Sequence, residues 1–148
     1  MKSRKMILIY TLILLTSCIA KGNHLDYSFM VAEDDELIRI RESALIQMRN
    51  YLVISNTLDY SELEIKEVDN ILLEYYNDIY CAFIINTTDY LPYVQEIVRK
   101  FNTLNMQTNY SIIETIEREL LCDYIIKTTI RFGFLKDYSD ITFAWREW

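Results

Sequence analysis

The sequence predicts a single all-α domain, a small bundle of about four main helices followed by a short C-terminal helix. Three observations support this prediction. Apolar residues recur at three- and four-residue steps over four long stretches, which is the spacing of one buried helix face. Only two glycines and one proline interrupt the 148 residues, too few for the turns of an all-β fold. With 51% hydrophobic and 25% charged residues, the composition is that of a folded globular chain.

The first predicted helix runs from Asp34 to about Ile54. It begins with three acidic residues, which the positive end of the helix dipole stabilises. Its apolar face would consist of Leu37, Ile40, Ala44, Leu45, Met48, Tyr51 and Leu52.

A second helix is predicted from Ser61 to about Asn77, because Ser61 and Glu64 have the spacing of a capping box. The following run, residues 79–85 (IYCAFII), is rich in β-branched and aromatic residues. Such a run suits either a buried strand or a continued helix. We favour the helix, since the sequence offers no evident partner strand.

The third and fourth helices follow breaks in the apolar pattern. Residues 86–89 offer several N-cap side chains before a helix that extends to about Leu104, and Pro92 suits an early helical position. Ser111 and Glu114 have the spacing of a second capping box. The helix they would begin is expected to reach about residue 131.

The C-terminal end of the chain carries its own signals. Gly133 is a natural residue for the position after a helix, because glycine adopts positive φ without strain. Ser139 offers an N-cap for a short last helix. Phe143, Trp145 and Trp148 are apolar enough to predict that this helix packs back on the bundle.

The first 18 residues have the features of an exported precursor. Residues 1–5 carry three positive charges and precede a ten-residue apolar run, which fits a signal peptide but is too short to span a membrane. Residues 15–18, Leu-Thr-Ser-Cys, resemble the lipobox of bacterial lipoproteins. The resemblance implies cleavage before Cys18, a diacylglycerol on its sulfur and acylation of its new amino group. The alternatives are a plain secretory signal with an incidental cysteine, or an uncleaved anchor.

This resemblance divides the chain into a signal peptide (1–17), a lipidated Cys18 with a tether (18–33) and a helical domain (34–148). Its lipid would hold the protein on a membrane of the bacterial cell envelope. Ile19 in place of an aspartate favours the periplasmic face of the outer membrane. His24, the one histidine, falls in the tether, where no surrounding shell would orient it as a base.

Processing makes the chain strongly acidic. Removing residues 1–17 leaves 131 residues with 12 basic and 22 acidic side chains, a net charge of −10. Sequence-independent nucleic-acid binding needs a basic surface, so it is excluded. An acidic domain of this kind is expected to be repelled by an anionic membrane, so that it is held away from the surface on its tether. It is also expected to attract a basic protein partner.

With Cys18 lipidated, two cysteines remain. Cys81 and Cys122 both lie in apolar stretches, and an oxidising compartment permits a disulfide between them. Free cysteine is also among the most buried residue types, so two separate core thiols are the alternative, which we favour.

Residues 115–124 (TIERELLCDY), with Gly133 and the final tryptophan, are similar to the C-terminal part of the bacterial domain-of-unknown-function family 4844. Its members are small helical proteins with a T-x-[DE]-R-E-x-[VL]-C-x-Y stretch. The resemblance covers roughly the last 35 residues and implies an all-α fold. It implies no activity and no functional residue, since none is established for the family.

Four residues are candidates for partner binding. Arg118 and Glu119 lie in the stretch just described, and a solvated helix surface is the alternative for both. Glu114 and Arg118 have the spacing of an ion pair along one helix. Trp145 and Trp148 either anchor a partner with their amphipathic rings or close the core.

The sequence predicts no catalytic residues, no metal site and no cofactor. With one histidine, the chain cannot supply the two histidine ligands that many metal sites use. No group of acids has the D-x-D-x-D-G pattern of a calcium loop. The acidic groups at 34–36 and 62–69 are expected to be solvated helix faces. A glycosidase needs two carboxylates at a defined separation, which sequence spacing does not establish.

These features predict a non-enzymatic, lipid-anchored envelope protein that binds a protein partner. It would act as an immunity or inhibitor protein, or as an accessory subunit of an envelope complex. The alternatives are a hydrolase that acts on the cell wall through carboxylates, and a purely structural envelope lipoprotein.

Overall fold

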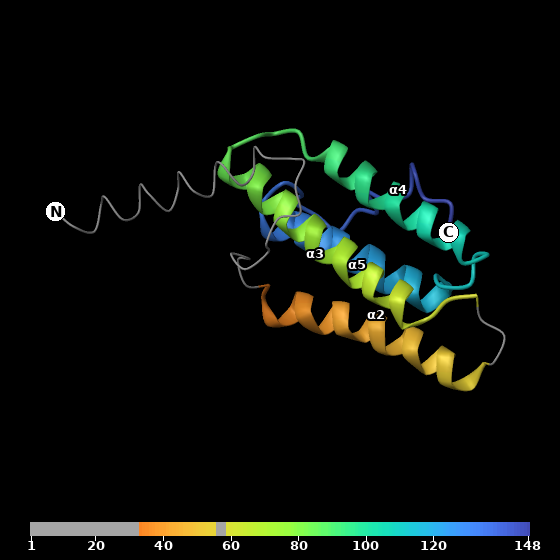
Figure 1. Cartoon of the computed structure of the whole chain (residues 1–148). Helices are drawn as coiled ribbons and strands as arrows, with labels where there is room; N and C mark the ends of the chain where they lie inside the picture. The colour runs from red at the N-terminus through yellow and green to blue at the C-terminus, as the bar shows by residue number, and fades with distance from the viewer. Residues whose placement is uncertain (1–32, 56–58) are drawn as a thin grey trace.

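The computed structural model of the chain describes residues 33–55 and 59–148, and within these residues it contains helices and no strand. The helices are α2 (Asp35–Ile54), α3 (Glu62–Ile84), α4 (Leu91–Gln107) and α5 (Thr115–Arg131). They run alternately up and down, and α3 contacts the other three (Figure 1). The predicted all-α bundle is therefore confirmed. The signal peptide and Cys18 lie outside the described residues.

The first two helices begin where the sequence predicts. Asp34 is the N-cap of α2, and its Oδ1 accepts the N–H of Leu37 at 2.9 Å. Ser61 is the N-cap of α3, and its own N–H donates to Glu64 Oε2 at 2.8 Å, as in a capping box. The ambiguous run 79–85 is helical up to its last residue, so the preference for helix is confirmed.

The start of α4 uses none of the polar residues that precede it. Its N-cap is Tyr90, without a side-chain hydrogen bond, and Pro92 lies in its first turn. Asn86 instead ends α3 with a φ of 56°, the left-handed conformation that asparagine tolerates after a helix. Thr87 Oγ1 accepts the N–H of Asp89 at 3.3 Å, which fixes the turn between the two helices.

The start of α5 lies three residues later than the sequence predicts. Glu114, not Ser111, is the N-cap, and its N–H donates to Glu117 Oε2 at 3.2 Å. Ile113 comes before the helix because it is buried there, with its N–H donated to the side chain of the buried Asn105 at 3.2 Å.

The predicted C-terminal helix is wrong, because residues 132–148 form turns and irregular structure. Gly133 follows α5 with a φ of 77°, as predicted. Ser139 caps no helix. Asp140 accepts the N–H of Thr142 at 3.0 Å, and this local side-chain bond competes with helix formation. We call residues 138–148 the C-terminal strap, because side-chain contacts hold them on the bundle.

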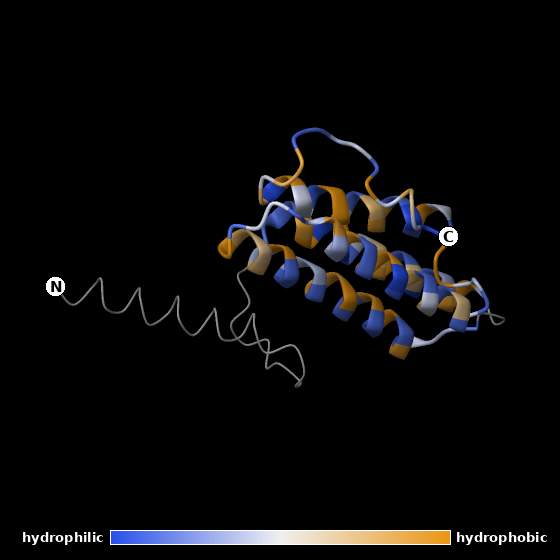
Figure 2. Ribbon diagram, turned by 90° about the horizontal axis from the view of Figure 1, so that it is seen from above, coloured by the Kyte–Doolittle hydropathy of each residue, from blue (hydrophilic) through white to orange (hydrophobic). Residues whose placement is uncertain are grey.

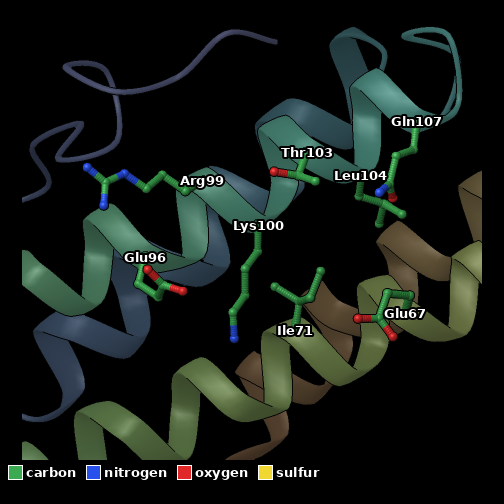
Figure 3. A pocket seen from close by; sticks show the side chains of 8 residues that line it. All are labelled: Glu67, Ile71, Glu96, Arg99, Lys100, Thr103, Leu104 and Gln107. Carbon is green, nitrogen blue, oxygen red and sulfur yellow. The ribbon is translucent and has the colours of Figure 1, made fainter.

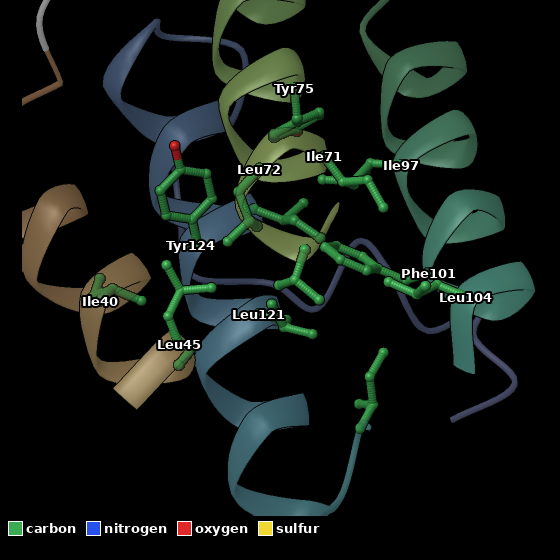
Figure 4. Close-up of a cluster of buried hydrophobic side chains, with 14 of the residues drawn as sticks. Ile40, Leu45, Ile71, Leu72, Tyr75, Ile97, Phe101, Leu104, Leu121 and Tyr124 are labelled. Atoms are coloured by element: carbon green, nitrogen blue, oxygen red, sulfur yellow. The ribbon is translucent and has the colours of Figure 1, made fainter. Parts of the chain in front are cut away.

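The core consists mainly of the apolar faces that the sequence predicts, and orange and blue residues alternate along the helices (Figure 2). Ile71, Leu72, Phe101, Leu121 and Tyr124 meet in its centre (Figure 4). The largest fully buried side chains are Tyr76, Tyr124, Phe101, Leu37, Met48, Ile65, Leu72, Ile79, Ile112, Leu121, Ile125 and Ile126.

A polar cluster closes the bundle where α2, α3 and α5 meet. Arg41 Nη2 lies 2.9 Å from the Glu33 carboxylate, and its other amino group pairs with Asp69 on α3. The buried Tyr124 of α5 donates its hydroxyl to Glu33. Burial and the bond to Glu33 raise the pKa of Tyr124, so this phenol stays protonated. The side chains of Glu33 and Arg41 are only 5% and 13% exposed.

Candidate functional site

A polar groove of about 680 Å³ lies between α5 and the C-terminal strap. Helical spacing places Arg118, Cys122 and Ile126 on one face of α5, and Glu119 and Asp123 beside them. The strap supplies the opposite wall. The lining residues are Ile116, Arg118, Glu119, Leu120, Cys122, Asp123, Ile126, Tyr138, Asp140 and Arg146.

A thiol lies at the base of this groove. Cys122 is buried, and its Sγ accepts a hydrogen bond from Arg146 Nη1 at 2.8 Å and lies 3.4 Å from Thr142 Oγ1. Burial raises the pKa of the Cys122 thiol in spite of these contacts. Only the thiolate is a good nucleophile, so this cysteine is suited to packing rather than to attack on a substrate.

Most of the charged and hydroxyl groups along the groove are paired. Arg146 lies 3.0 Å from Asp140, and Tyr138 donates its hydroxyl to Asp123 at 2.6 Å. Although burial opposes it, hydrogen bonds from Thr142 and the charge of Arg146 lower the pKa of Asp140. The sequence prediction missed the wall of the groove that the strap supplies. The one local signal for it is the cationic Arg146, which lies between two tryptophans in the sequence.

Arg118 and Glu119 are the exceptions. Among the described residues neither side chain has an ion pair, and the predicted pair between Glu114 and Arg118 does not form. Glu114 is the N-cap of α5, so it is outside the regular turns that would align the two side chains. The groove therefore presents one positive and one negative group to the solvent.

Trp145 and Trp148 do not line the groove but hold the strap against α4. Asn102 Nδ2 donates to the carbonyl of Trp145 at 2.9 Å, and its Oδ1 accepts the N–H of Glu147 at 3.2 Å. Trp148 meets the buried Phe101 edge to face, with ring centroids 6.0 Å apart. Both indoles are half-buried against the core, which gives them a packing role.

Cys81 and Cys122 do not form the disulfide that the sequence permitted, because Cys122 is a free thiol. The favoured alternative of two separate core thiols holds for the buried Cys122 but not for Cys81, which is only half-buried. The rings that flank Cys81, Tyr80 and Phe83, lie against Phe132. Phe132 is ten residues beyond Cys122, or roughly 15 Å along a helix axis. A disulfide needs the two Cα atoms within about 7 Å, so these positions cannot be bridged.

A second, smaller pocket of about 350 Å³ lies between α3 and α4 (Figure 3). Lys100 pairs with Glu74 at 2.6 Å, which neutralises its charge. The pocket also contains Glu67, Glu96 and Arg99 around an apolar base of Ile71 and Leu104. Within the described part of the chain, no three histidine, cysteine or acidic side chains are grouped as a metal site would require.

Comparisons with known proteins add no relative. No protein family, no curated protein and no solved structure matches this chain. The similarity of residues 115–124 to an uncharacterised helical family therefore stays a prediction. Among the described residues, no helix has the length and apolar character needed to cross a bilayer.

Proposed function

We propose that this protein is a non-enzymatic, lipid-anchored envelope protein that binds a basic protein partner through the groove between α5 and the strap. One observation carries the proposal. Arg118 and Glu119 stand without intramolecular ion pairs at a groove whose other charged groups are fixed by one another. Charges held in this way give orientation and specificity to a protein contact.

The chemistry of the groove supports binding over catalysis. Burial raises the pKa of the Cys122 thiol, and burial together with Asp123 raises the pKa of Tyr138, so both groups are neutral proton carriers at ordinary pH. Hydrogen bonds from Thr142 and the charge of Arg146 hold Asp140 as an anion. None of these three groups has its pKa moved toward neutral pH, where general acids and bases work best.

The charge of the processed chain supports a basic partner. With residues 1–17 removed the net charge is −10, which speeds the encounter with a positively charged protein and suppresses contact with acidic ones. An immunity protein that masks a basic toxin, or an inhibitor of a basic hydrolase, uses the same complementarity.

The lipid anchor is the second part of the proposal and is tested separately. Cys18→Ser removes the sulfur that would carry the diacylglycerol. The variant should lose palmitate labelling, and it should leave the membrane fraction or accumulate as unprocessed precursor. Palmitate incorporation equal to that of the wild type would refute the lipoprotein assignment.

The groove is tested by capture of the partner. The full-length protein, purified in detergent, is cross-linked in envelope extracts, and captured proteins are identified by mass spectrometry. The double variant Arg118→Ala/Glu119→Ala should reduce affinity for the partner about tenfold. Association of the wild type should slow as ionic strength rises from about 0.05 M to about 0.3 M.

The matched control is Glu96→Ala/Arg99→Ala, which removes one charge of each sign from the exposed side of α4. This control should bind like the wild type. Equal binding by both double variants would exclude the groove as the contact surface, and salt-independent association would exclude a partner selected by its charge.

A further inference from the structure

Three apolar side chains are exposed at the end of the bundle where α2 begins. Phe83, Ile85 and Leu91 are 51%, 49% and 45% exposed, and they surround the connection from α3 to α4. Phe83 is supported by Phe132, with ring centroids 5.8 Å apart. Because α3 and α4 hold these side chains in place, the surface they form is preorganised. We call these three residues the apolar end patch.

The chain enters the bundle at the same end. Asp34, the N-cap of α2, pairs with Arg131, the last residue of α5, and Phe132 follows directly. Phe132 in turn lies against Phe83 of the patch. Figure 1 shows the start of α2, the connection between α3 and α4 and the end of α5 on one side of the molecule.

The segment that would join the lipid to this end is short. Fourteen residues, 19–32, separate Cys18 from Glu33. Fourteen residues span at most about 50 Å, even when fully extended. A lipid on Cys18 would therefore hold the apolar end patch within reach of the bilayer surface at a high effective concentration.

The charges near this end are mostly neutralised, unlike the net charge of the whole chain. Asp34 pairs with Arg131, and Glu36 pairs with Lys127 at 2.6 Å. Asp35 and Asp89 remain exposed nearby, which disfavours an anionic lipid surface. The local chemistry therefore fits zwitterionic headgroups.

We infer that the apolar end patch rests on the bilayer, with Phe83, Ile85 and Leu91 inserted among zwitterionic lipid headgroups. The inference rests on the lipid anchor of the proposed function, since three half-exposed apolar side chains are too weak to hold a protein on a membrane alone. This contact fixes the orientation of the bundle and turns the opposite end, with Val53 and Ile54, away from the membrane.

The test places one photo-crosslinking amino acid at a time in the full-length, lipidated protein, reconstituted in phosphatidylcholine vesicles. The probe replaces Phe83 or Leu91 in the patch. The matched controls carry it at Val53 or Leu63, which are 84% and 72% exposed near the opposite end. All four sites are surface positions, so folding is retained, and helical circular dichroism checks this for each variant.

Flotation of the vesicles is measured first, and lipid adducts are then counted by mass spectrometry. The expected result is flotation of every variant, with about fivefold or more lipid adducts from the patch than from the controls. Flotation with equal adduct yields at the two ends would overturn this inference and leave the anchor intact. A chain that does not float overturns the anchor and the inference together.

Discussion

The two halves of α5 use similar side chains in different ways. In the C-terminal half, Lys127 and Arg131 are neutralised by acids from the start of α2, and Tyr124 is bonded to Glu33. In the N-terminal half, Arg118 and Glu119 have no ion pair among the described residues and lie at the groove. The charges of one half therefore hold two helices together, whereas those of the other half stay available for the partner contact that we propose.

The largest expected effect is in the buried polar cluster where Glu33 joins Arg41 of α2 to Tyr124 in the C-terminal half of α5. Arg41→Ala leaves the carboxylate of Glu33 buried without its cation, and this should lower the free energy of unfolding by about 3 kcal/mol. Arg49→Ala is the control, since its pair with Glu62 is solvent-exposed and worth less than about 0.5 kcal/mol. Denaturant titration of both variants measures the difference. Equal, small losses would show that the enclosed cluster adds nothing.

The strap should have an intermediate effect. Trp148→Ala removes an indole that packs on Phe101 and lies under the guanidinium of Arg146. Because the ring is half-buried, we expect a loss of about 2 kcal/mol, below the cost of truncating a fully enclosed aromatic side chain. Thermal melts followed by the fluorescence of the remaining Trp145, which reports on the strap, decide this. An unchanged melting temperature would return Trp148 to the list of possible partner anchors.

A smaller effect, with a defined pH dependence, is expected at Glu117. Burial raises the pKa of this carboxyl above its value in the unfolded chain, so the native state binds its proton more tightly. The stability it contributes is complete at low pH and is lost as pH rises through the native pKa. Glu117→Gln should therefore raise the melting temperature near pH 7 and change it little near pH 4.

The control for this prediction is Glu119→Gln, because the neighbouring carboxylate is exposed. Its melting temperature should differ from the wild type by the same small amount at both pH values. Calorimetry over this pH range measures both variants. A pH-independent shift in Glu117→Gln would show that folding does not change the pKa of this carboxyl, and a loss of stability confined to pH 7 would show that the carboxylate is stabilised as an anion.

The smallest effect on stability is expected at the open groove. Arg118→Ala removes a charge without an intramolecular partner among the described residues, so the free energy of unfolding should change by less than about 0.5 kcal/mol. Urea titration measures this change. A loss as large as that of Arg41→Ala would erase the contrast between the two halves of α5.

Sequence predicted the features that depend on local signals. The capping box at Ser61, the left-handed Gly133 and the apolar faces of α2, α3 and α4 each follow from neighbouring residues. The start of α5 did not, because the buried Asn105 holds Ile113 outside the helix, and no local pattern reveals that contact.

Only one wall of the candidate site, the one formed by α5, could be predicted from local signals. Arg118 and Glu119 stand on a helix whose existence could be predicted from its period. Its inner face could not, because Glu117 is buried and the neighbouring Ile116 is exposed. The strap wall, with Tyr138 and Arg146, is irregular and is placed by contacts to Asp123 and Cys122 on another element. Such pairings depend on the fold as a whole.

The position of the tryptophans has a spectroscopic consequence. The chain has only two, and both belong to the strap. Intrinsic fluorescence therefore reports whether the strap is docked on α4, whereas far-ultraviolet circular dichroism reports the helices. Because the strap has no helix or strand of its own, it is expected to undock before the bundle unfolds. The two signals then change at different denaturant concentrations, and the midpoint and slope of the fluorescence transition give the docking free energy of the strap.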